Sequence, residues 1–119
     1  MTIATTAEKF RKISRDELKM KIDSGKPFTL WNVLTKEYYH SDKNIPGSIW
    51  VPVNELEQRL PSLNAKKTDE IVVYCGSTQC PSSRQAAQKL ASLGYTNVSA
   101  FEGGVADWQE ADLPFVTLQ

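Results

Sequence analysis

Short apolar runs alternate with amphipathic segments along this chain, and the alternation predicts its secondary structure. Apolar runs bounded by polar or turn residues are typical of buried strands, and they occur at residues 27–33, 48–53, 70–75 and 97–101. The amphipathic segments between them predict helices at residues 13–24, 54–63, 82–93 and 104–111. The polar stretch at residues 36–47 ends in Pro-Gly and predicts a short helix or an irregular turn.

Polar residues and a proline mark where these helices begin and where one should break. Ser14 is a candidate N-cap and Glu17 follows three residues later, which is the pattern of a capping box. Ser82 or Ser83 is the candidate cap of the third helix. Pro61 predicts an interruption of the second helix, because proline removes a backbone hydrogen bond and clashes with the preceding turn.

The order of strands and helices predicts an α/β fold. Strands joined through helices run mostly parallel, and such a sheet is covered by helices on both faces. The first 11 residues are mostly polar and predict a flexible N-terminal arm, so one domain is expected at residues 12–119. In a sheet of this kind, ligands bind beyond the carboxyl ends of the strands.

Composition narrows the class of function. Lysine and arginine together number 14, as do aspartate and glutamate, so the balanced charge argues against a general grip on nucleic acid or a membrane surface. There is no apolar run long enough to span a bilayer, and the first 12 residues lack the apolar core of a secretory signal. We therefore expect a cytoplasmic protein whose two cysteines are thiols.

Cys75 is the strongest candidate for chemistry, because it follows the clearest strand and precedes a helix. Unpaired amides at a helix N-terminus stabilise an anion, and a cysteine placed there is expected to have a lowered pKa. The alternative is a buried cysteine with a structural role only. The small, polar loop after Cys75 favours a reactive thiol with backbone amides around it. The candidate anion cradle comprises Gly76, Ser77, Thr78, Gln79, Cys80, Pro81 and Ser82.

The chain resembles the rhodanese domain over residues 12–116. In the first half, the resemblance lies in the helix that begins Ile-Ser-Arg-Asp-Glu-Leu, the strand Thr-Leu-Trp-Asn-Val and the sequence Ile-Pro-Gly-Ser-Ile. The order and spacing of these motifs, rather than any one of them, make the resemblance specific. In the second half, the matching positions are Cys75, Ala86-Ala87, Gly94-Tyr95, Asn97-Val98, Gly103-Gly104, Trp108 and Leu113-Pro114.

This resemblance implies a three-layer fold with a five-stranded, mostly parallel sheet. It also implies sulfur transfer, in which Cys75 takes a sulfane sulfur from a small sulfur-containing donor and becomes a persulfide. The persulfide then passes its sulfur to a thiophilic acceptor, which is cyanide, a small thiol or the thiol of a protein partner. No cofactor and no metal are implied.

The chain departs from the family pattern in its active loop. Many rhodaneses have an arginine five residues after the cysteine, whereas this chain has Cys80 and then Pro81. A variant with a Cys-x4-Cys loop is the nearest match. Arg84 is the first arginine after the loop and a candidate substrate contact, although its place on the helix predicts that it points outward.

Three further departures remove charge from the region. The common Asp-Val-Arg of the early strand is Asn32-Val33-Leu34, and the usual histidine before Ile-Pro-Gly is Asn44. Less positive charge then remains to receive a dianion. Turnover of thiosulfate is therefore expected to be weak.

Cys80 leaves several interpretations open. It is a candidate resolving thiol for a persulfide or sulfenic acid on Cys75, a small residue packed at the loop edge, or itself the primary nucleophile. The pair could also serve as a thiol-disulfide redox sensor, or the domain could be a binding or regulatory module without turnover. A cysteine phosphatase is disfavoured because Pro81 replaces its arginine, and two cysteines with His40 make no convincing zinc site.

Overall fold

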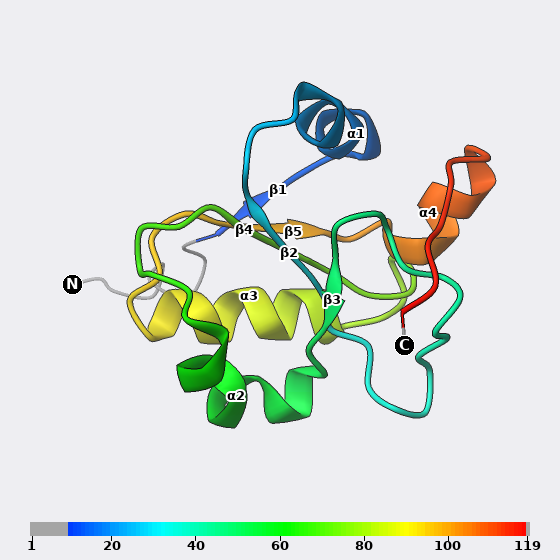
Figure 1. Cartoon of the computed structure of the whole chain (residues 1–119). Helices are drawn as coiled ribbons and strands as arrows, with labels where there is room; N and C mark the ends of the chain where they lie inside the picture. The colour runs from blue at the N-terminus through cyan, green and yellow to red at the C-terminus, as the bar shows by residue number, and fades with distance from the viewer. Residues whose placement is uncertain (1–9, 119) are drawn as a thin grey trace.

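A computed structural model describes residues 10–118 of the protein (Figure 1). The predicted strands and helices are present with shorter bounds, and residues 36–47 form turns without a helix. A 3-10 helix at Val53–Glu55 leads directly into α2. The strands are β1 (Arg11–Lys12), β2 (Thr29–Asn32), β3 (Ile49–Trp50), β4 (Ile71–Tyr74) and β5 (Val98–Phe101). The helices are α1 (Arg15–Ser24), α2 (Leu56–Leu63), α3 (Ser82–Ser92) and α4 (Gly104–Glu110).

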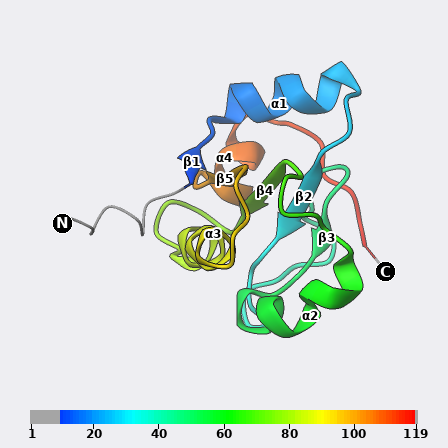
Figure 2. The ribbon, with the colours of Figure 1, turned by 90° about the vertical axis from the view of Figure 1, so that its left-hand side faces the viewer.

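The strands form one five-stranded parallel sheet in the order β1-β5-β4-β2-β3. β4 is central, and all four of its residues are buried, as expected for a parallel strand covered on both faces. Seen from the side, α1 and α4 lie on one face of the sheet and α2 and α3 on the other (Figure 2). The predicted α/β, three-layer fold is confirmed.

Alternation along β4 divides the core in two. Ile71 and Val73 face α2 and α3, and Cys75 continues this face beyond the end of the strand. Val72 and Tyr74 face the other way and pack with residues of α1 and α4. Cys75 is therefore placed on the side of the sheet where α3 begins.

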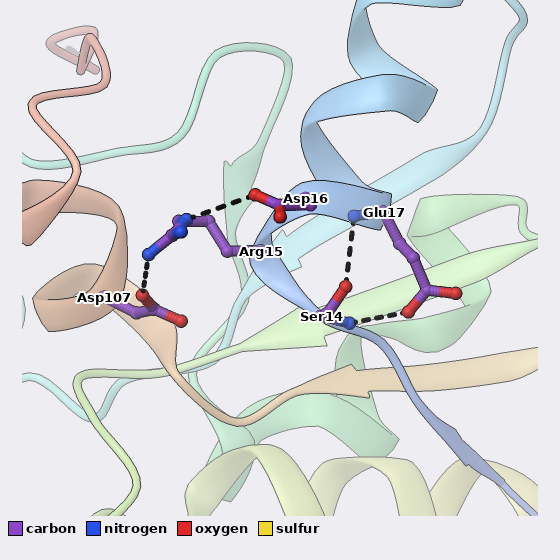
Figure 3. Close-up of polar contacts among 5 residues, drawn as sticks. All are labelled: Ser14, Arg15, Asp16, Glu17 and Asp107. Atoms are coloured by element: carbon purple, nitrogen blue, oxygen red, sulfur yellow. Dashed lines mark hydrogen bonds and ion pairs between the residues drawn. The ribbon is translucent and has the colours of Figure 1, made fainter.

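The first turn of α1 confirms the predicted capping box and also joins two elements (Figure 3). The Glu17 amide donates to Ser14 Oγ at 3.1 Å, and the Ser14 amide donates to Glu17 Oε1 at 2.9 Å. Arg15 Nη1 donates to Asp107 Oδ1 at 2.8 Å, which ties the start of α1 to α4. Since α4 begins beside the Cys75 loop, this ion pair helps to hold α4 in the position where it contacts the loop.

Two expectations about helix ends were wrong. Pro61 does not interrupt α2, because it lies in the last turns, where it costs one hydrogen bond while Leu60 and Leu63 still pack on the core. Neither Ser82 nor Ser83 caps α3. The helix begins instead with the Gln85 amide bonded to the Pro81 carbonyl at 3.0 Å.

The sheet includes one residue that precedes the expected start of the domain at residue 12. Residues 1–9 of the predicted arm lie outside the described residues, but Arg11 already belongs to β1 and pairs with Ser99 of β5. A strand of two exposed residues leaves no hydrophobic pattern, because backbone pairing alone defines it. None of the helices within residues 10–118 is long and apolar enough to cross a membrane.

Candidate active site

The start of α4 holds the backbone that carries Cys75. The Val105 amide donates to the Cys75 carbonyl at 2.9 Å, and the Ala106 amide donates to the Gly76 carbonyl at 2.8 Å. Gly104 has a φ of +60°, and a Cβ on it would lie 2.2 Å from the Cys75 carbonyl oxygen. Only glycine permits this close approach, which explains the second glycine of the Gly-Gly pair.

The loop after Cys75 folds back so that Cys80 lies against it. The Cys80 amide donates to the Ser77 carbonyl at 3.0 Å, and the Gln79 amide donates to Ser77 Oγ at 3.2 Å. The Cys75 thiol donates to the Cys80 carbonyl oxygen, with Sγ and O 3.4 Å apart. Both cysteines are free thiols, and they interact directly with each other.

Cys75 is fully buried, and its environment differs from the one we expected. Burial raises the pKa of the Cys75 thiol to about 11, and the hydrogen bond with Cys80 adds to the increase. The hydroxyl and amide of Ser83 act in the opposite direction on the pKa of Cys75, but they do not overcome burial. The expectation of a lowered pKa at Cys75 was wrong for this arrangement, because desolvation outweighs the helix N-terminus.

The lowered pKa belongs to Cys80 instead. Partial burial opposes ionisation of Cys80, but the nearby Cys75 thiol and the amides of Gly76 and Ser82 favour its thiolate. Together these donors lower the pKa of Cys80. Thus the amides of Gly76 and Ser82 face the sulfur of Cys80, and that of Ser83 faces the sulfur of Cys75.

A cavity of about 690 Å³ opens beside Cys80. This volume is within the usual range for small-molecule sites. Among the described residues that line the cavity, none carries a charged side chain, and neither Cys75 nor Arg84 is one of them. The lining residues are Leu34, Thr35, Tyr38, Gly76, Ser77, Gln79, Cys80, Pro81 and Ser82.

The other candidate residues lie outside the cavity wall. Arg84 is exposed on α3, in agreement with its expected outward direction. Thr78 is exposed at the tip of the loop and lies outside the cavity wall, and His40 is exposed in a turn.

Sequence reasoning missed two features of the site. Ser83 was not assigned to the site, yet its buried hydroxyl lies beside Cys75 and makes no well-formed hydrogen bond with the described residues. Its position in the first turn of a helix after the Cys75 loop was the available signal. Leu34, Thr35 and Tyr38 form the far wall of the cavity, and no local pattern indicates that contact.

Two of the three positions where charge is missing, Asn32 and Asn44, form a neutral polar cluster on the opposite face of the sheet. The third, Leu34, packs on the Cys75 side and lines the cavity. Asn32 Nδ2 donates to Asn44 Oδ1 at 3.0 Å, and the Leu34 amide donates to Asn32 Oδ1 at 3.1 Å. The Tyr74 hydroxyl receives the Ile45 amide at 3.0 Å. Two buried amides thus bond to each other at positions where an acid and a histidine are common.

Comparison with known proteins agrees with this fold. The Rhodanese-like domain matches residues 14–111. This chain belongs to the rhodanese-like family. The solved structure of the human single-domain sulfurtransferase TSTD1 superposes with a TM-score of 0.73 and 31% identity, covering 83% of this chain and 95% of TSTD1.

Two curated relatives show similar identity. The thiosulfate sulfurtransferase PspE of Escherichia coli is 32% identical over 76 residues, which are 64% of this chain and 69% of PspE. YrkF of Bacillus subtilis is 31% identical over 102 residues, which are 86% of this chain and 52% of YrkF. The chain spans about half the length of the curated relatives that match most of it.

Proposed function

We propose that this rhodanese-like protein is a sulfurtransferase that carries a sulfane sulfur as a persulfide on Cys75. The observation that supports this most strongly is the position of Cys75, directly after the central strand and beside the amide and hydroxyl of Ser83 in the first turn of α3. A persulfide anion formed there is near two hydrogen-bond donors and a helix N-terminus. PspE and TSTD1, which are named as sulfurtransferases, support the same class of reaction.

The cavity supports a particular class of donor. Thiosulfate is a small dianion, and the described residues that line the cavity offer no cationic side chain to receive it. The cavity offers instead the apolar surfaces of Leu34, Tyr38 and Pro81. We propose that an organic persulfide is the better donor, and that cyanide, a small thiol or the thiol of a protein partner is the acceptor.

The intact mass of the reduced protein tests this function after separate incubation with thiosulfate and with an uncharged alkyl persulfide. We expect a gain of one sulfur atom with the alkyl persulfide, a smaller gain with thiosulfate, and reversal by cyanide. At equilibrium with alkyl persulfide and alkyl thiol, the adduct should be much less abundant on Cys75→Ser than on wild type. No sulfur on wild type with either donor would contradict the proposal.

A thiol-disulfide sensor is the second candidate, because the two thiols are in direct contact. Oxidation of the pair would remove two hydrogen atoms and leave a Cys75–Cys80 disulfide. The same mass spectra distinguish this function. A mass loss of two hydrogens on treatment with peroxide, without any gain of sulfur from persulfide donors, would favour the sensor.

A further inference from the structure

The two thiols differ in access to the cavity. The side chain of Cys75 is 0% exposed, and Cys75 does not line the cavity. Cys80 is partly exposed and belongs to the cavity wall. A donor seated in the cavity therefore meets the sulfur of Cys80 before that of Cys75.

Cys80 is also placed to react. Its sulfur interacts with the amides of Gly76 and Ser82, which lower its pKa and favour the thiolate. The sulfur of Cys75 is in contact with the same residue, because the Cys75 thiol donates to the Cys80 carbonyl oxygen at 3.4 Å. A group attached to the sulfur of Cys80 would therefore lie within reach of Cys75.

We propose that Cys80 is a catalytic residue that accepts the sulfane sulfur at the cavity and passes it inward to Cys75. This relay rests on the sulfurtransferase function proposed above and adds a second reacting thiol to it. It assigns the two cysteines different tasks. Cys80 captures the sulfur, and Cys75 stores it away from solvent.

The two steps are balanced exchanges without an added oxidant or reductant. In the first, the Cys80 thiolate attacks the outer sulfur of an alkyl persulfide, forms Cys80–S–SH and releases the alkyl thiolate. In the second, Cys75 gives up its proton and attacks the outer sulfur of that persulfide. Cys75–S–SH forms, and Cys80 leaves as a thiolate that takes up the proton.

Ser83 favours transfer of the sulfur from Cys80 to Cys75. Its side chain is 0% exposed, and the hydroxyl makes no well-formed hydrogen bond with the described residues. A buried polar group without a partner costs about 1–3 kcal/mol. An anionic persulfide on Cys75 would accept from both the hydroxyl and the amide of Ser83, which favours Cys75 over Cys80 as the resting place.

Rapid-quench mass spectrometry of the full chain tests the relay. The reduced protein is mixed with an uncharged alkyl persulfide at neutral pH, quenched with an alkylating agent and digested, so that sulfur on each cysteine is located. In wild type, we expect sulfur on Cys80 first and on Cys75 later. Cys75→Ser should still load sulfur on Cys80, and Cys80→Ser should load Cys75 about tenfold more slowly than wild type.

Each alternative result has its own meaning. Loading of Cys75 at the wild-type rate in Cys80→Ser would overturn the relay and leave the sulfurtransferase function intact. Loss of two hydrogens from wild type, with release of sulfide, would mean that the pair closes into a disulfide, and would also overturn it. The absence of sulfur from wild type and both single variants would overturn the function and the relay together.

A matched control separates chemistry from folding. Gln85→Ala changes an exposed residue of α3 outside the cavity wall and should load at the wild-type rate. Cys80→Ala provides a second variant with no hydroxyl in place of the thiol. If both Cys80 variants melt near wild type and both load slowly, a folding defect does not explain the result.

Discussion

Two polar clusters lie at the carboxyl ends of β2 and β4, on opposite faces of the sheet, and they differ in how fully their hydrogen bonds are satisfied. In the first, Asn32, Asn44 and Tyr74 are buried, and each bonds to side chains or backbone nearby. In the second, Cys75 and Ser83 are just as buried, but the Ser83 hydroxyl has no well-formed hydrogen bond with the described residues.

This difference separates a structural cluster from a reactive one. A satisfied buried network stabilises one arrangement, and removing one of its members leaves others unpaired. A donor left without a partner beside a thiol costs stability until an anion forms at that thiol. We therefore expect substitutions in the asparagine cluster to affect mainly folding, and those in the thiol cluster to affect mainly sulfur loading.

The largest expected effect comes from disturbing the contact between the start of α4 and the Cys75 backbone, without changing either thiol. Gly104→Ala would place a Cβ 2.2 Å from the Cys75 carbonyl oxygen at a φ of +60°. Overpacking and the strained backbone should together lower the free energy of unfolding by about 3 kcal/mol or more. Urea denaturation measures this loss, and the folded fraction should load sulfur poorly.

Gly25→Ala is the matched control for Gly104→Ala. Gly25 also has a positive φ, of +75°, but a Cβ there would meet no atom within 4 Å. Its cost should be limited to backbone strain of about 1 kcal/mol. Equal costs at the two glycines would show that contact with Cys75 does not determine the effect at Gly104.

The asparagine cluster should show the next largest loss of stability. Asn32→Ala removes the partner of Asn44 Oδ1 and of the Leu34 amide, both of which are buried. The expected decrease in the free energy of unfolding is about 2 kcal/mol, with sulfur loading per folded molecule near that of wild type. Asn54→Ala, at an exposed position, is the control and should change the stability by less than about 0.5 kcal/mol.

The two clusters also show which features can be predicted from the sequence and which cannot. The apolar run of β4, the capping box at Ser14 and the spacing around Cys75 are local patterns, and the structure confirms the elements they predict. Which amides face which sulfur depends on how the loop after Cys75 folds back, and no periodicity determines that. The same holds for the pKa values, because burial of Cys75 results from contacts far apart in the sequence.

A smaller change sharpens the comparison at Ser83. Ser83→Ala removes a hydroxyl that makes no well-formed hydrogen bond, so the free energy of unfolding should stay within about 0.5 kcal/mol of wild type or rise. The persulfide on Cys75 should become less stable by about one hydrogen bond, which corresponds to an equilibrium yield about fivefold lower. Persulfide content at equilibrium with excess alkyl thiol measures this yield.

The control for Ser83→Ala lies at the other end of the same helix. Ser92 Oγ donates to the Lys89 carbonyl oxygen at 2.7 Å, far from the thiols. Ser92→Ala should leave the persulfide yield unchanged. A yield equal to that of wild type in Ser83→Ala would instead mean that the hydroxyl does not bind the persulfide.

The free energy of unfolding should depend on pH in a way that reveals the buried Cys75 thiol. This contribution is constant near neutral pH and changes only in alkaline solution. The folded protein holds the Cys75 proton more tightly than the unfolded chain does, because burial raises the pKa of Cys75 to about 11. The stability that this provides is present below the ordinary thiol pKa of about 8.5 and is lost as the pH rises toward 11. Wild type should therefore lose stability faster than Cys75→Ser across this range.

Comparing the two proteins at each pH cancels contributions from groups that do not interact with Cys75, including Tyr74, whose pKa burial raises to about 12. Urea denaturation at a series of pH values gives both curves. Parallel curves would mean that Cys75 ionises as easily in the folded chain as in the unfolded one. Cys75 would then form a thiolate as readily as an unfolded cysteine does. Only the better access of Cys80 to the cavity would remain as a reason for Cys80 to capture the sulfur first.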